Sequence, residues 1–204
     1  NYGPVGLTTG GSNNEICDTD GRCQLLQLKG GMSLLNAYPQ SGTDNTARNS
    51  REKMFSETIP NLFNSIPAGL PGIASGDWNS ITRNIDATNN PESKISPSLR
   101  RLISVKKWSD IHIQLGLGTK YTRFHSSNGI CSATRLDRIY SIGGLKATSC
   151  EYVPVPFSDH LVTIATFESV ESVVAETPHQ KSRFKSNKSL VQNLKVCLLY
   201  TSPS

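Results

Sequence analysis

The segment Gly72-Ile73-Ala74-Ser75-Gly76-Asp77-Trp78-Asn79 decides the fold of this 204-residue chain. It begins as a short, mostly apolar run, and that run stops at Gly76-Asp77. This pattern is typical of a buried strand that presents a polar group at its C-terminal edge. A carboxylate in that place is costly unless it is paired, hydrogen-bonded or metal-bound, so Asp77 is a candidate site residue.

Hydrophobic spacing before this segment predicts two strands and one helix. The expected elements are strands over 22–28 and 32–38 and a helix over 47–66. The two strands are joined by Lys29-Gly30-Gly31, a glycine-containing hairpin connection. The helix is amphipathic because apolar residues from Phe55 to Ile66 recur at three- and four-residue spacing, and Pro60 is expected to kink it.

The sequence after this segment predicts a loop, a second helix and more strands. Residues 79–96 form a long polar stretch that is expected to be a loop. Ser96 followed by Pro97 is typical of a helix start, and this helix should run to about Lys106. Further short strands are expected over 119–124, 134–141 and 161–167. Strands mixed with two helices over one core indicate an α/β or α+β layered domain.

The composition is that of a polar, loop-rich folded chain. Hydrophobic residues make up 36% of the chain and charged residues 18%, both below the usual averages for globular proteins. The net charge is +5, but five of the 21 basic residues lie in 177–204, which contains no acidic residue. The rest of the chain is therefore electrically balanced. A basic tail is commonly a solvated linker, so net charge alone does not support DNA binding.

The apolar runs and the cysteine spacing bear on two further classes, membrane-spanning proteins and proteins built on zinc or disulfides. No stretch approaches the run of about 18 apolar residues that a membrane span requires, so a spanning role is excluded. The five cysteines are scattered, without a CxxC pair or a histidine at metal-ligand spacing. They therefore predict neither a zinc site nor a disulfide framework, and a reducing, intracellular compartment fits best.

Three polar clusters follow or interrupt apolar segments. They are Gly76-Asp77-Trp78-Asn79, Arg135-Leu136-Asp137-Arg138-Ile139-Tyr140 and Ser158-Asp159-His160. Each cluster alone is consistent with ordinary acidic loop residues. Purely structural roles are the alternatives. Tyr38 would then be a packing residue and Asn79 a turn residue, and Asp137 would form an ion pair with Arg135 or Arg138. The remaining histidines, His112, His125 and His179, lack such a context and are expected at the surface.

Together, in this order, the clusters resemble the endonuclease/exonuclease/phosphatase family, which includes deoxyribonuclease I and the apurinic/apyrimidinic endonucleases. The first cluster is similar to the family's GDxN strand end and the third to its SDH signature. Thr134-Arg135-Leu136-Asp137-Arg138-Ile139 resembles the (S/T)R(I/L)D(Y/R)I strand. Leu34-Leu35-Asn36-Ala37-Tyr38-Pro39 and Lys120-Tyr121-Thr122 resemble two further family segments. The resemblance runs from about Gly6 to about Thr166 and implies a four-layer α/β sandwich, with two packed mixed β-sheets flanked by helices.

The resemblance also implies roles in metal-dependent phosphodiester hydrolysis. The implied catalytic residues are Asp77, Asn79, His160, Asp137 and Tyr38. Asp159 is implied as a ligand of Mg²⁺ (or Mn²⁺) or of its water shell, and Asn36, Thr122 and Ser158 as substrate-positioning residues. Asp77 would orient or deprotonate the attacking water, and Asn79 and Tyr38 would contact the phosphate. Asp137 would fix the tautomer of His160 and raise its basicity.

Within this family the chain most resembles the endonuclease domains of non-LTR (LINE-type) retrotransposons. The pointers are Asn36-Ala37-Tyr38, Arg51-x-x-x-Phe55, Trp108-Ser109-Asp110 and the stretch 182–190. This resemblance implies nicking of target DNA in the nucleus, with a reverse transcriptase fused downstream. The alternatives are a cellular relative, such as a repair endonuclease or a phosphatase acting on phosphoinositides or sphingomyelin, and a non-catalytic remnant that binds nucleic acid.

This chain departs from the family pattern near its N-terminus. Family members carry a metal-binding Glu well upstream, and Glu15 lies too close to Gly21-Arg22 to be that residue. We therefore expect the domain to be incomplete at its N-terminus, with weak Mg²⁺ binding and weak or no DNA nicking. The expected divisions are a partial catalytic domain over 1–168, a basic linker over 169–196 and an unassigned end over 197–204.

Overall fold

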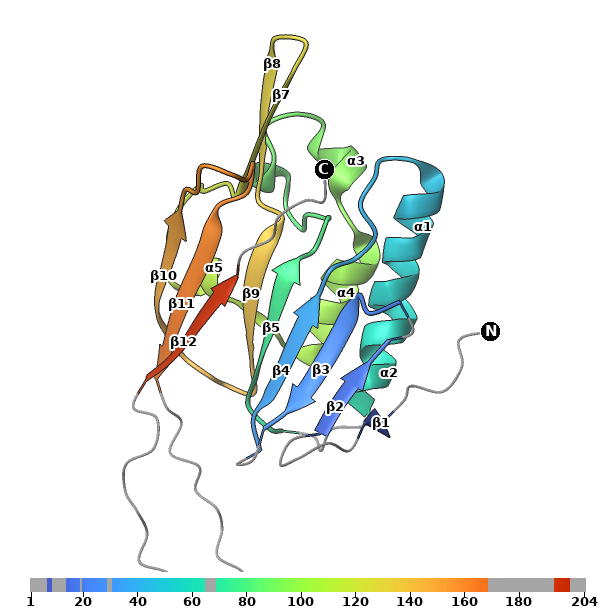
Figure 1. Cartoon of the computed structure of the whole chain (residues 1–204), viewed down its shortest axis with the longest axis vertical. Helices are drawn as coiled ribbons and strands as arrows, with labels where there is room; N and C mark the ends of the chain where they lie inside the picture. The colour runs from blue at the N-terminus through green and yellow to red at the C-terminus, as the bar shows by residue number, and fades with distance from the viewer. Residues whose placement is uncertain are drawn as a thin grey trace, which may run out of the picture.

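The computed structural model describes residues 7–8, 14–18, 20–28, 31–64, 69–168 and 193–198. Within these residues the largest sheet has seven strands in the order β1-β2-β3-β4-β5-β9-β6 (Figure 1). Its strands are β1 Leu7–Thr8, β2 Asn14–Cys17, β3 Cys23–Gln27, β4 Ser33–Ala37, β5 Gly72–Asp77, β6 Ser109–Asp110 and β9 Asp137–Ile142. Strands β4 and β5 are parallel, and the other neighbours are antiparallel.

Two smaller sheets and a set of helices complete the described structure. The smaller sheets are β10-β11-β12, formed by Ala147–Val153, Val162–Glu168 and Asn193–Leu198, and the hairpin β7-β8, formed by Arg123–Ser127 and Ile130–Thr134. The α-helices are α1 Asn45–Lys53, α2 Ile59–Asn64, α3 Pro91–Lys94, α4 Pro97–Lys106 and α5 Ile111–Gln114. A π-helical turn, Met54–Thr58, joins α1 to α2, and Asn84–Asp86 form a 3₁₀ turn.

The core lies on both faces of the central strands β5 and β9. On one face, Ala74 and Tyr140 pack in a cluster with helix residues such as Phe55 and Leu99. On the other face, Ile73 and its neighbours pack against the β10-β11 sheet. In the described residues the layers are therefore helices, large sheet and second sheet (Figure 1). The predicted α/β sandwich with two packed sheets is confirmed.

Several predicted elements are present. The strands expected over 22–28 and 32–38 form an antiparallel pair, although Lys29 and Gly30 of the expected turn lie outside the described residues. The expected helix start at Ser96 is confirmed, because its side chain accepts a hydrogen bond from the Leu99 N–H. The strand expected over 161–167 is β11. The helix expected over 47–66 becomes α1, the π-helical turn and α2, and its last two residues lie outside the described residues.

The irregularity expected at Pro60 takes the form of this π-helical turn. Proline has no N–H to donate, and its ring crowds the carbonyl four residues earlier in a regular α-helix. The helix widens just before Pro60, where the Ile59 N–H donates to the Met54 carbonyl five residues earlier. The widened turn therefore accommodates the proline without ending the helix.

The strand expected over 119–124 is wrong, because the strand there, β7, covers Arg123–Ser127. Its position is set by the turn Asn128-Gly129, where both residues have positive φ (51° and 75°), as a two-residue hairpin turn requires. The strand expected over 134–141 is β9, which begins only at Asp137. The loop expected over 79–96 contains α3 and the 3₁₀ turn and buries Ile81 completely.

The linker expected over 169–196 and the unassigned end over 197–204 stay predictions. Strand β12 pairs antiparallel with β11 and crosses the expected boundary at 196. The rest of the expected linker, 169–192, and the end, 199–204, lie outside the described residues. Among the helices of the described segments, none combines the length and apolar character needed to cross a membrane.

Candidate active site

Two aspartates face each other where β5 ends and β9 begins. The antiparallel register of these strands pairs Asp77 directly with Asp137. Directly opposed residues of an antiparallel pair project to the same face, and like charges in that arrangement are destabilising. Both side chains are also buried, at 3% and 2% exposure. This placement is costly for the fold, which marks it as a candidate functional site.

Gly76 fixes the end of β5 against its parallel neighbour β4. Its φ is +155°, and a Cβ at this position would lie 1.9 Å from the backbone carbonyl oxygen of Ala37. No side chain fits in that space. Because β4 and β5 are parallel, Tyr38, which follows β4, and Asp77 reach the same edge of the sheet.

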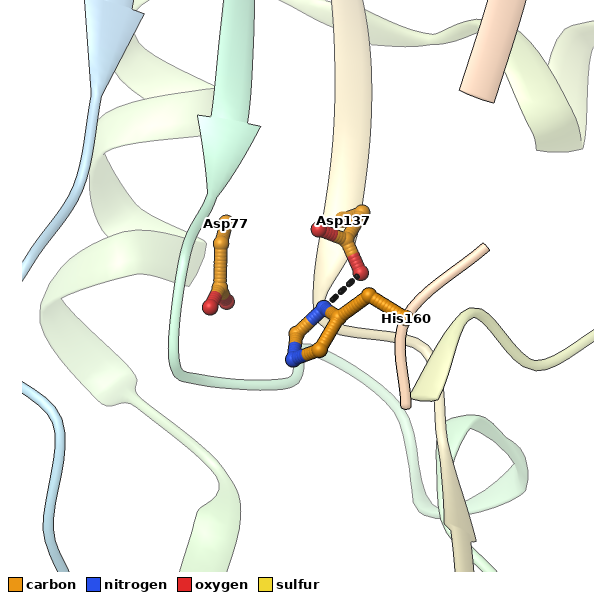
Figure 2. Close-up of side chains that lie close together, drawn as sticks. All are labelled: Asp77, Asp137 and His160. Atoms are coloured by element: carbon orange, nitrogen blue, oxygen red, sulfur yellow. Dashed lines mark hydrogen bonds and ion pairs between the residues drawn. The ribbon is translucent and has the colours of Figure 1, made fainter. Parts of the chain in front are cut away.

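Asp137 and His160 form a buried hydrogen-bonded pair. The His160 Nδ1 lies 2.8 Å from an Asp137 carboxylate oxygen, and the ring is 3% exposed (Figure 2). Asp77 lies beside this pair in Figure 2. One ligand atom from each of the three side chains lies within 4.8 Å of the others. The carboxylate accepts the Nδ1–H, so Nε2 is the ring atom that can exchange a proton.

Thr122 holds the two halves of this pair together. It is completely buried, and its hydroxyl oxygen accepts hydrogen bonds from the Leu136 and Asp137 N–H groups, both at 3.0 Å. Its carbonyl accepts the Leu161 N–H at 2.7 Å, one residue after His160. Thr122 therefore binds the backbone next to Asp137 and next to His160. The partners of its hydroxyl are backbone N–H groups.

Asp159 lies beside the pair but has a different partner. Its carboxylate accepts a hydrogen bond from Arg123 Nε at 2.8 Å, and its second oxygen lies 3.9 Å from His160 Nε2. Among the described residues its carboxylate is not part of the convergent group, which consists of Asp77, Asp137 and His160. Ser158 caps the same turn, because its hydroxyl accepts the His160 N–H at 3.0 Å.

Asn79 combines a turn role with a place at the site. Its φ is +45°, and its N–H donates to the Asp77 carboxylate at 2.9 Å, which fits the turn expected after an aspartate. Its side-chain amide donates to the Pro39 carbonyl at 3.0 Å and so ties the end of β5 to the segment after Tyr38. Asn79 and Tyr38 both line the cleft described below.

The two arginines near Asp137 in the sequence, Arg135 and Arg138, belong to a buried ion network. Arg135 contacts Asp86 at 3.0 Å and Asp110 at 2.8 Å, and Arg138 contacts Asp86 at 3.1 Å. The alternative in which Asp137 pairs with one of these arginines is therefore wrong, because both arginines pair with Asp86 instead. Burial would raise the pKa of Asp86, but Arg138 and Arg135 lower it to about 2.

The site opens into a polar cleft of about 370 Å³. Of the predicted site residues, those that line it are Tyr38, Asp77, Asn79 and His160. Asn36 is exposed on β4 and does not line the cleft. Sequence reasoning missed three cationic lining residues, Arg51, Lys94 and Arg123. Arg51 had a signal, because a basic residue four positions before Phe55 falls on the apolar face of the expected helix.

The charges in the cleft shift two pKa values. Burial, reinforced by the charge of Asp137, raises the pKa of Asp77 to about 6. Burial alone would lower the pKa of His160, but the hydrogen bond and charge of Asp137, with the charges of Asp77 and Asp159, raise it. Near neutral pH, Asp77 is thus ionised but more basic than an ordinary aspartate.

The cluster of Asp77, Asp137 and His160 fits a divalent cation. Carboxylate oxygens are the protein ligands that Mg²⁺ prefers, and Mn²⁺ accepts both carboxylate and imidazole. Burial first, and then the charge of Asp137, raises the pKa of Asp77, so two ionised carboxylates in this place are costly without a cation. A cation beside both carboxylates would offset this cost. Among the described residues, this is the group of acidic and histidine side chains placed to hold a metal ion.

The other histidines divide between core, surface and undescribed chain. The expected surface position of His112 is wrong, because its ring is buried, with Nδ1 2.7 Å from the Tyr152 hydroxyl and Nε2 2.9 Å from the Gly118 carbonyl. His125 is exposed, as expected. His179 lies outside the described residues.

The structure is similar to that of an AP endonuclease from Archaeoglobus fulgidus, with a TM-score of 0.59 and 16% sequence identity over 81% of this chain and 70% of that one. It is also similar to the 3′ phosphatase NExo from Neisseria, bound to a product DNA hairpin, with a TM-score of 0.57 and 17% identity over the same shares. No protein-family model matches the chain, and no curated protein matches its sequence. The likeness shows that this chain shares the α/β sandwich fold of these two proteins.

Proposed function

We propose that this chain is a metal-dependent DNA endonuclease of the kind found in non-LTR retrotransposon polyproteins. The observation that carries the proposal is the convergence of Asp77, Asp137 and His160 at a cleft that also has cationic walls. Buried carboxylates and a carboxylate-bound imidazole suit proton transfer, and cationic side chains suit a phosphate substrate.

The protein groups supply both proton transfers of phosphodiester hydrolysis. Ionised Asp77 orients the attacking water and accepts its proton as the water oxygen bonds to phosphorus. His160 Nε2 gives a proton to the phosphate or to the leaving oxygen as the P–O bond breaks. Asp137 holds the Nδ1–H throughout and so keeps the imidazole in the required orientation.

The implied cation has a definite place in this scheme. Asp77 and Asp137 would hold it, and a bound Mg²⁺ or Mn²⁺ would neutralise charge on the phosphate. Asn79 and Tyr38 line the cleft, and their proposed role is to contact the phosphate oxygens. Arg123, which lines the cleft, binds the Asp159 carboxylate, and the proposed role of Asp159 is in the water shell of the cation.

Two further observations support DNA as the substrate and a retroelement as the source of the chain. The two structural neighbours are an AP endonuclease and a 3′ phosphatase bound to a DNA hairpin, so proteins of this fold act on phosphate esters of DNA. The motif resemblance supports a LINE-type endonuclease, fused to a reverse transcriptase and acting on nuclear DNA.

Nicking of supercoiled plasmid by the purified chain tests the proposal. Mg²⁺ and Mn²⁺ are each titrated to tens of millimolar, so that weak binding of either cation is also detected. We expect slow nicking that requires the cation and falls by at least about a hundredfold in Asp77→Asn and His160→Ala. Glu151→Gln, at an exposed acid on β10, is the matched control and should nick like the wild type.

Two results would overturn the proposal. One is a chain that nicks no DNA at any concentration of either cation. The other is nicking that continues undiminished in Asp77→Asn, which would point to a contaminating nuclease. A 3′-phosphorylated oligonucleotide in the same assay distinguishes a phosphatase, because it would lose its phosphate while the plasmid stays intact.

A further inference from the structure

The cations that line the cleft differ in their partners. Within the described part of the chain, Arg123 pairs with a carboxylate, that of Asp159. Arg51 donates instead to two backbone carbonyls, those of Gln40 and Gly42, both at 2.8 Å. Lys94 donates to the Thr134 hydroxyl at 3.1 Å. Two cations therefore face the cleft with neutral oxygen partners, and burying an uncompensated charge is unfavourable.

Lys94 is the better placed of these two cations to bind a ligand. Arg51 is 6% exposed, and its bonds hold the loop after β4, so its guanidinium serves the fold. Lys94 is only half-buried. An ammonium group has three protons, and the Thr134 hydroxyl accepts one of them, which leaves donors for an anion in the cleft.

The surrounding chain fixes Lys94 beside the catalytic cluster. Its carbonyl accepts the Ile81 N–H at 2.9 Å, two residues after Asn79. Its side chain is held by Thr134, three residues before Asp137. Lys94 is thus tied to the chain near both strand ends that supply the paired aspartates. Burial, with the charge of Arg123, also lowers the pKa of Lys94, as expected for a cation that lacks a counter-ion.

We propose that Lys94 binds a backbone phosphate of DNA next to the phosphate that is cleaved. This inference rests on the proposed function, because the substrate must be a strand with successive phosphates. The ammonium supplies a point charge for one phosphate, while Asp77, Asp137 and His160 act on its neighbour. The contact adds affinity for DNA of any sequence, because a phosphate carries no base information.

DNA binding without divalent cations tests this site independently of cleavage. The affinity of a short hairpin DNA for the full chain is measured by fluorescence anisotropy in EDTA over a range of KCl concentrations. Lys94→Gln should weaken binding about tenfold and reduce the slope of log Kd against log salt by about 1, the value for one lost phosphate contact. Lys94→Arg should restore the affinity. The control is Lys120→Gln, at an exposed lysine outside the cleft.

A neutral phosphate analogue locates the contact. Once the cut site in the hairpin is mapped, a methylphosphonate replaces each flanking phosphate in turn. With one of these substitutions, wild type and Lys94→Gln should bind equally well. The proposal is overturned if Lys94→Gln keeps the wild-type slope, if Lys120→Gln lowers the slope as much, or if both analogues leave the difference unchanged. If Lys94→Gln weakens DNA binding as expected but the wild-type chain cleaves no DNA, the proposed function is rejected and the phosphate site stands.

Discussion

Removing the hydroxyl of Thr122 should destabilise the protein far more than removing the hydroxyl of a comparable buried threonine. Thr122→Val keeps the shape of the side chain but loses the oxygen that accepts the Leu136 and Asp137 N–H groups. Because Thr122 is completely buried, water does not replace the lost acceptor. Both N–H groups would then be left without a partner.

The size of the effect follows from these two groups. Each buried donor without a partner costs about 1–3 kcal/mol, so Thr122→Val should lower the free energy of unfolding by about 2–6 kcal/mol. Thr163 on β11 provides the control, because it is 1% exposed and its hydroxyl has no hydrogen-bond partner among the described residues. Thr163→Val removes an unsatisfied oxygen and should change the free energy of unfolding by less than about 1 kcal/mol.

Urea unfolding of the wild type and both variants measures this difference. The slope of free energy against urea should stay constant, so that the midpoint reports stability alone. Thr122→Ser, which keeps the acceptor oxygen, should recover most of the loss. If Thr122→Val is no less stable than Thr163→Val, the two hydrogen bonds contribute nothing and Thr122 does not support Asp137.

Three further predictions concern charge and backbone. Because the pKa of Asp86 is about 2, below its ordinary 3.8, its ionised form stabilises the fold above about pH 4 by about 2 kcal/mol. Urea midpoints should show this stabilisation disappearing as pH falls through about 2, and Asp86→Asn should lack that step. For Asp77 the sign is opposite. Its pKa of about 6 means that stability falls by about 3 kcal/mol as pH rises from about 4 to 6. Asp77→Asn should therefore melt at a higher temperature than the wild type at pH 7.5 without divalent cations, and a lower melting temperature would contradict the assignment. Gly76→Ala places a Cβ against the Ala37 carbonyl and should abolish cooperative unfolding, whereas Gly116→Ala, in open space at φ +64°, should cost only about 1–2 kcal/mol.

The elements predicted correctly are those with local signals. Ser96-Pro97 begins a helix because the serine caps it and the proline fits its first turn, and both effects act within a few residues. The strand expected over 119–124 was misplaced because the Asn128-Gly129 turn, beyond that window, sets where the hairpin pairs. Ile81 looked like a loop residue, yet it bridges Ile95 and is fully buried, which depends on contacts across the loop.

The site shows the same division between motif residues and their partners. Motif resemblance selected Asp77, Asp137 and His160, which the structure brings together. Lys94 was not found, because its position depends on Thr134, 40 residues away in the sequence. The partners of the motif arginines were missed for the same reason, because Asp86 and Arg135 are 49 residues apart. Sequence spacing indicates which residues end strands but not which distant side chain faces them.

The contrast among the buried aspartates locates the function within the fold. Asp86 and Asp110 are neutralised by the guanidinium groups of Arg135 and Arg138. Asp77 is buried as deeply, yet among the described residues no cationic side chain lies within ion-pair distance of it, and its cross-strand partner is another aspartate. A fold that pairs Asp86 and Asp110 with arginine could place an arginine beside Asp77 as well. Because an arginine beside Asp77 would occupy the space that a cation needs, we infer that the missing counter-charge comes from a bound metal ion.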